Sequence, residues 1–138
     1  MFARRLTEVE PFQCAGIDFG MLLPRDVTDS VEIVLAVLKP GMESPVDQHA
    51  TFDQVFWIIE GEGDLTIGAE RALVGPQTVA FIPRDTPHTI KCVSGSGLKY
   101  LYLNVWGKGV PELERLWRKV YLNVHARRTA AAPPLTRE

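Results

Sequence analysis

Short runs of hydrophobic residues, rich in β-branched and aromatic side chains, alternate along this chain with turn-forming sequences. The turns contain Gly, Pro or Asp, as in EGEG, VGPQ and VSGSG, and this spacing is typical of a β-sandwich or a small barrel. Because the connections are too short for parallel crossovers, the pattern predicts an antiparallel all-β fold. The expected strands are residues 31–38, 55–60, 63–68, 71–74, 78–82, 89–93 and 98–106.

Two of these strands, VEIVLAVL and VFWII, are apolar on both faces. A strand of this kind is covered on both sides. The opposite sheet would cover one side, and another subunit or a terminal segment would cover the other. We therefore expect a homodimer.

The two ends of the chain differ from this pattern. Apolar residues recur at intervals of three and four from Pro111 onward, which predicts a C-terminal amphipathic helix over residues 111–127. Its apolar face could dock on its own domain or on a partner chain. We expect a single domain, with an edge strand and loops in residues 1–30, the barrel core in residues 31–106 and a disordered tail in residues 128–138.

Composition narrows the range of partners and compartments. The 138 residues carry 15 basic and 17 acidic side chains, for a net charge of -2, without a long run of one sign. This balance argues against nucleic acid and anionic membranes as partners. Cys14 and Cys92 lie far apart and form no zinc motif, and no run is apolar enough for an export signal or a membrane span. The sequence thus predicts a cytoplasmic protein.

Polar residues gather at the start of two predicted strands. Asp47 and His49 share one face if their segment is extended, Gln54 begins the next apolar strand, and His88 begins another strand directly after Pro87. Imidazole nitrogens together with hard oxygens suit Fe(II), Mn(II), Ni(II) or Zn(II). A mononuclear divalent-metal site is one interpretation, and hydrogen-bonded surface histidines are the other.

The spacing of these residues resembles the cupin family. The first cupin motif, G-x5-H-x-H-x(3,4)-E-x6-G, aligns with Gly41, Asp47, His49, Gln54 and Gly61, and the second motif aligns with the stretch from Gly75 to His88. The resemblance implies an antiparallel cupin or jelly-roll β-barrel. It also implies a metal held by Asp47, His49, Gln54 and His88.

This chain departs from the family's usual three His and one Glu. Asp47 stands at the first His and Gln54 at the Glu, although Asp53 is a second possibility for the Glu position. Asp is shorter than His, so the resemblance implies weak metal retention. Asp85 replaces a Gly in the second motif, and Asp tolerates the left-handed backbone better than most residues.

Strand alternation extends the predicted site into a pocket. If Gln54 and His88 face inward, the residues in phase with them do so as well. The tyrosines of the last strand form either a pocket wall or a subunit interface. The residues expected to bind substrate are Phe56, Ile58, Cys92, Tyr100 and Tyr102.

Two functions are consistent with this sequence. The first is a metal-dependent small-molecule enzyme of the isomerase, dioxygenase or lyase type, in which Asp47, His49 and His88 are catalytic. The second is a non-catalytic ligand-binding or sensor cupin with a degenerate or metal-free site. The altered first histidine position favours the second function, and the fold alone does not choose between them.

Overall fold

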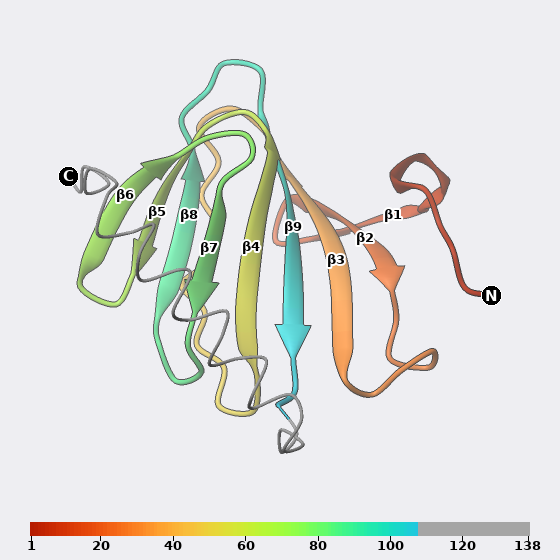
Figure 1. Cartoon of the computed structure of the whole chain (residues 1–138). Helices are drawn as coiled ribbons and strands as arrows, with labels where there is room; N and C mark the ends of the chain where they lie inside the picture. Colours follow the sequence, from red (N-terminus) through yellow and green to blue (C-terminus); the bar gives the residue numbers. More distant parts are fainter. Residues whose placement is uncertain (108–138) are drawn as a thin grey trace, which may run out of the picture. The chain divides into compact units, whose positions relative to one another are not determined.

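The computed structural model describes residues 1–107, in which nine strands form two antiparallel sheets (Figure 1). The prediction of an antiparallel all-β fold is confirmed. Over these residues the one helix is a short 3-10 turn. In chain order the elements are η1 (Leu6–Glu8), β1 (Pro11–Cys14), β2 (Ile17–Leu23), β3 (Val31–Leu38), β4 (Asp53–Glu60), β5 (Gly63–Ile67), β6 (Glu70–Val74), β7 (Val79–Ile82), β8 (His88–Cys92) and β9 (Leu98–Val105).

The larger sheet has the strand order β1-β2-β3-β9-β4-β7, and the smaller sheet has the order β6-β5-β8. One buried cluster joins them, with side chains from β3, β4, β7 and β9 packed together with side chains from β5, β6 and β8. The two sheets therefore form a β-sandwich around a single core. The N-terminal 30 residues contribute two strands, with β1 at the edge of the large sheet and β2 paired to β3.

Alternation along β4 decides which side chains face the core. Gln54, Phe56 and Ile58 are buried, whereas Trp57 between them is 48% exposed. Successive residues of a strand point to opposite faces, so Asp53 lies on the outer face with Trp57. The sheet thereby turns a polar amide, and not the neighbouring carboxylate, toward the interior.

The outer face of β4 and β7 carries large apolar side chains that are partly exposed. Trp57, Val79 and Phe81 are 48%, 62% and 58% exposed, and Trp57 pairs directly with Val79 in the sheet register. This is the face that the sequence predicted to be covered. The homodimer stays a prediction.

Two turns carry the chain between the sheets, and they lie against each other. Gly61 follows β4 with a φ of +81°, and Gly97 precedes β9 with a φ of +94°. A Cβ atom built on Gly61 would lie 2.0 Å from the carbonyl oxygen of Gly97. The close approach and the left-handed backbone both require glycine at position 61.

The predicted helix over residues 111–127 and the predicted tail over residues 128–138 lie outside the described residues. Within residues 1–107, no helix has the length and hydrophobicity needed to cross a bilayer. Cys14 and Cys92 are both free thiols.

We predict that Gly61→Ala destabilises the fold by roughly 2–4 kcal/mol, because the substitution adds left-handed strain and a backbone clash. Gly95→Ala is the matched control, since nothing lies within 4 Å of a Cβ atom at that position and its φ is not positive. The control should change the free energy of unfolding by less than about 0.5 kcal/mol. Urea denaturation measures both, and equal effects would contradict the role given to Gly61.

Candidate functional site

An irregular strap, residues 41–49, runs along the outer edge of β8 and places the first motif beside the second. The backbone amide of Ser44 donates to the carbonyl of Ile90 at 2.9 Å. Asp47 and His88 exchange two backbone hydrogen bonds of 3.0 and 2.9 Å. Directly opposed residues of an antiparallel pair have their side chains on the same side, so the Asp47 carboxylate and the His88 ring lie on one face.

A second set of contacts ties the strap to the turn before β8. The backbone amide of Asp85 donates to the carbonyl of His49 at 2.6 Å, and the Gln48 side-chain amide donates to the Asp85 carbonyl at 3.0 Å. Asp85 has a φ of +60°, which confirms its expected left-handed backbone. Backbone pairing at both Asp47 and His49 thus fixes where the two histidines meet.

The His49 and His88 rings are close neighbours, with centroids 5.3 Å apart. Phe52 stacks on His49 with a centroid separation of 4.5 Å. Phe56 presents an edge-to-face contact to His88 at 5.9 Å. Two aromatic side chains therefore limit the motion of both imidazoles.

Gln54 joins this site from β4 and is only 5% exposed. Its Nε2 donates to Asn104 Oδ1 of β9 at 2.7 Å, while its Oε1 is buried and has no hydrogen-bond partner. A buried acceptor without a partner costs free energy. It is therefore a place where a bound donor or cation would be favourable.

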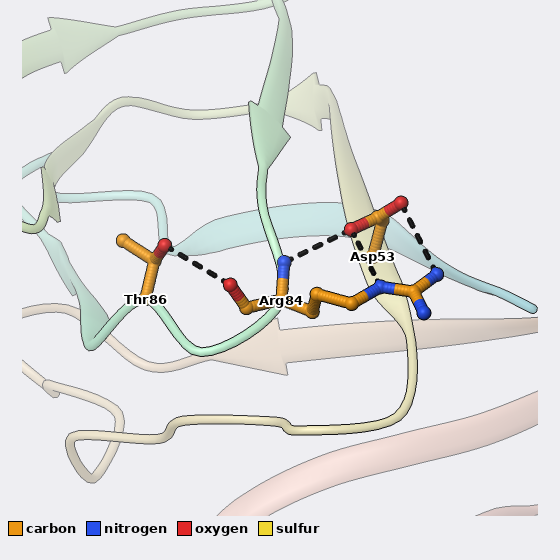
Figure 2. A network of polar contacts seen from close by, with 3 residues as sticks. All are labelled: Asp53, Arg84 and Thr86. Carbon is orange, nitrogen blue, oxygen red and sulfur yellow. Dashed lines mark hydrogen bonds and ion pairs between the residues drawn. The ribbon is translucent and has the colours of Figure 1, made fainter.

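Asp53, the other possibility for the family's Glu position, is engaged elsewhere. Its carboxylate accepts hydrogen bonds from the backbone amide of Arg84 at 2.9 Å and from the Arg84 guanidinium at 3.2 Å (Figure 2). The backbone and side-chain hydrogen bonds from Arg84 hold the pKa of Asp53 below its usual value. Asp53 closes the turn between β7 and β8 and does not line the cavity, so Arg84 is paired and not simply a solvated turn residue.

A cavity of about 160 Å³ opens where these groups meet. It contains all four predicted metal ligands and three of the five predicted substrate-binding residues. The tyrosine face of β9 is therefore a wall of this cavity. The lining residues are Ile17, Phe19, Ser44, Pro45, Asp47, His49, Phe52, Gln54, Phe56, His88, Tyr100, Tyr102 and Asn104.

Ile58 and Cys92 do not line the cavity, in contrast to the expectation from the sequence. Both are fully buried members of the hydrophobic core. They face inward as alternation requires, but Ile58 lies four residues beyond Gln54 and Cys92 lies four residues beyond His88, which is roughly 13 Å along each strand. At that depth the opposite sheet fills the interior. On β4 and β8 the first inward positions reach the cavity and the later ones pack, whereas on antiparallel β9 the order is reversed.

Several cavity residues were not singled out from the sequence. Ile17 and Phe19 come from β2, in the N-terminal part that was assigned only loosely. Phe52 lies in the loop before β4. Alternation along the last strand already places Asn104 on the same face as Tyr100 and Tyr102, and the sheet register sets it opposite Gln54.

Residues 34–105 match Cupin_2, a family of cupin domains. The chain belongs to this cupin family. An uncharacterized protein from Methanocaldococcus jannaschii is 30% identical over 66 residues, which are 48% of this chain and 53% of that protein. The matched segment thus spans about half the length of this relative.

Solved cupin structures share the fold of this cupin. A predicted oxalate decarboxylase from Thermotoga maritima has a TM-score of 0.73 at 16% identity, over 77% of this chain and all of its own. The polyketide cyclase RemF from Streptomyces resistomycificus has a TM-score of 0.67 at 20% identity, over 81% and 88% of the two chains. KdgF from Halomonas sp. has a TM-score of 0.65 at 16% identity, over 75% and 94%. At these identities the likeness concerns the fold alone.

The surroundings of His49 favour its neutral form in this cupin. Burial lowers the pKa of His49 below its ordinary 6.5, the neighbouring His88 lowers it further, and Asp47 opposes both effects. His88 is held differently, because its Nδ1 lies 2.9 Å from the Thr86 carbonyl oxygen. A carbonyl only accepts, so Nδ1 is the donor and Nε2 of the neutral ring carries the free lone pair.

The two tyrosines of the cavity wall remain protonated donors. Burial raises the pKa of Tyr100 well above its usual range, with smaller contributions from Tyr102 and Asp47. Burial, followed by the charge of Glu32, raises the pKa of Tyr102 to about 12. Their hydroxyl groups are thus suited to donating hydrogen bonds to a ligand and not to accepting a proton from one.

The donors of the cavity fit a weakly held divalent ion. The free nitrogen of His88, the neutral His49 ring and the unpartnered Gln54 oxygen are available as ligands. However, no three His, Cys, Asp or Glu side chains in the described part of the chain converge in a metal-binding arrangement. Two imidazoles and an amide oxygen would hold such an ion, with water or substrate supplying the remaining ligands.

We predict that in chelator-treated protein His49 titrates below 6.5, as followed by the ring resonances in NMR spectra. Asp47→Asn should lower this pKa further, because a favourable charge is lost. His88→Gln should raise it, because an unfavourable one is removed. A wild-type value at or above 6.5, or the same value in both variants, would contradict this account of the site.

The same depressed pKa has a consequence for stability. Below the unfolded value of about 6.5, the unfolded chain binds protons at this site more readily than the folded protein. The free energy of unfolding should therefore decrease as the pH falls from 6.5 toward the pKa of the folded state. Urea denaturation from pH 7.5 to 5 measures this slope, which should diminish in a His49→Gln variant.

Proposed function

We propose that this cupin is a small-molecule enzyme whose cavity binds an oxygen-bearing substrate beside a weakly held divalent ion. The observation that carries this proposal is the convergence of Asp47, His49, Gln54 and His88 on one cavity lined otherwise by aromatic and apolar side chains. Clefts with apolar walls and a few convergent polar groups are typical ligand sites.

Each polar residue has a role in this proposal. His49 and His88 are the anchors of the ion and Gln54 adds an oxygen ligand. When bound, the ion would polarise a substrate oxygen as a Lewis acid. Asp47 shares the face of His88 and would accept or return a proton on the substrate, while the neutral ring of His49 would keep its lone pair available for the ion.

The walls of the cavity complete the site. Phe52 stacks on His49, and Phe56 contacts His88 edge to face. Tyr100 and Tyr102 supply hydroxyl donors to orient the substrate. Such a site could support isomerisation, dioxygenation or lyase chemistry, and the fold does not indicate which of these reactions occurs.

A second function is favoured by a specific observation. Among residues 1–107, no cluster of three His, Cys, Asp or Glu side chains is placed to hold a metal. A non-catalytic ligand-binding or sensor cupin needs no such cluster. In that case the cavity would bind its ligand equally well with and without metal.

Metal analysis of untagged protein tests the first proposal. We predict substoichiometric metal after purification, and binding of added Zn²⁺ or Mn²⁺ by calorimetry that becomes at least about tenfold weaker in the His49→Ala/His88→Ala double variant. His125→Ala is the control, since His125 is the third histidine of the sequence and lies in neither motif. Its metal affinity should equal that of the wild type.

Equal metal content and equal affinity in the double variant and the wild type would refute the metal-dependent enzyme. The sensor alternative would then remain. The double variant should keep the wild-type cooperative unfolding, so that a loss of metal reports the site and not the fold.

A further inference from the structure

Three polar side chains, one from each of three neighbouring strands, form a row across the large sheet at the cavity, here called the polar rung. Glu32 of β3 stands opposite Asn104 of β9, and Asn104 stands opposite Gln54 of β4. Directly opposed residues share a face of the sheet, so all three side chains point inward. Gln54 and Asn104 are 5% and 6% exposed, in a layer that is otherwise apolar.

The hydrogen bonds of this rung have a single direction. The Glu32 carboxylate can only accept, so the contact of 2.8 Å requires Asn104 Nδ2 to donate. Asn104 Oδ1 is then the acceptor for Gln54 Nε2 at 2.7 Å. The charge of Glu32 thus dictates the orientation of two amides in succession, and it leaves Gln54 Oε1 without a partner.

The charged side chains around the cavity also affect which kind of ligand it can bind. Asp47 is the one carboxylic acid among the described lining residues of the cavity, and none of these lining residues is Lys or Arg. Glu32 is close enough to contribute to the raised pKa of Tyr102. An anionic ligand would meet carboxylates here and no cationic side chain of the Lys or Arg type, which disfavours it.

We propose that Glu32, Asn104 and Gln54 form a relay that fixes the Gln54 oxygen as an acceptor, so that the cavity selects neutral or cationic molecules that donate a hydrogen bond, such as small alcohols and polyols. Glu32 and Asn104 are positioning residues in this relay, and in the metal-free protein Gln54 contacts the ligand. This inference rests on the proposed function only in that the cavity binds a small molecule; it requires neither metal nor turnover.

The orientation of Gln54 is tested by NMR on chelator-treated protein without ligand. The side-chain amide resonances of Gln54 are assigned from their loss in Gln54→Glu. In the wild type, the amide proton bonded to Asn104 should exchange slowly with water. Glu32→Gln preserves size but can both donate and accept, so the direction of the relay is lost and exchange should become at least severalfold faster. Glu62→Gln, at an exposed position, is the matched control and should leave the exchange unchanged.

Ligand selection is tested with isopropanol and acetone, which have the same shape but differ in the ability to donate a hydrogen bond. In titrations followed by the resonances of the cavity residues, the wild type and Glu62→Gln should prefer isopropanol severalfold. Glu32→Gln should show a ratio of affinities near one, because its Gln54 amide can present either atom to the ligand.

Rapid exchange of the Gln54 amide in the wild type would overturn the relay, and so would slow exchange that persists in Glu32→Gln. The wild-type measurement decides this point even if the variant fails to fold. Equal affinity of the wild type for the two probes, or no binding of either, would overturn the selection of donors. Since all measurements are made without metal, failure of metal binding in the earlier experiment leaves these outcomes unaffected.

Discussion

The backbone pairing between the strap and β8 is the constraint on which the site depends. β8 is an edge strand, and its free hydrogen-bonding groups are met by Ser44 and Asp47 of the strap. An unpaired strand edge is unfavourable, so covering it stabilises the fold. The same bonds set Asp47 opposite His88. The same contacts therefore pair the edge of β8 and bring the residues of the site together.

The interior of the large sheet imposes a second requirement, because polar side chains buried among apolar ones need partners. Gln54 donates to Asn104, and Asn104 donates to Glu32 at the partly buried end of the row. One acceptor of Gln54 is left over. Among the buried side chains of residues 1–107, this oxygen is the one polar atom without a hydrogen-bond partner, which distinguishes a cavity wall that can bind a ligand from one that only packs.

The comparisons and the site carry different kinds of information. The cupin fold is shared with proteins that include a predicted oxalate decarboxylase and a polyketide cyclase, so the fold itself does not indicate a reaction. What is particular to this chain is the donor set. An Asp and an amide replace a histidine and a glutamate of the usual cupin motif, and the amide is bound into a row of side chains that ends in a carboxylate.

The sequence by itself determined the seven strands from Val31 onward, the antiparallel class and the family, because alternation, turn residues and motif spacing are local properties of the chain. It also brought Asp47, His49, Gln54 and His88 together as candidates. It did not determine which face of β4 is interior, since a period of two is the same from either side. That choice placed Gln54 inside and left Asp53 with Arg84.

Tertiary structure alone decided how deep each inward side chain lies. Ile58 and Cys92 have the correct parity, but they pack against the opposite sheet beyond the end of the cavity. Phe19 and Asn104 reach the same cavity from strands that are separated by most of the described chain. The depth of a side chain, and which distant residues it contacts, depend on how the two sheets pack against each other. No local pattern of residues records that position.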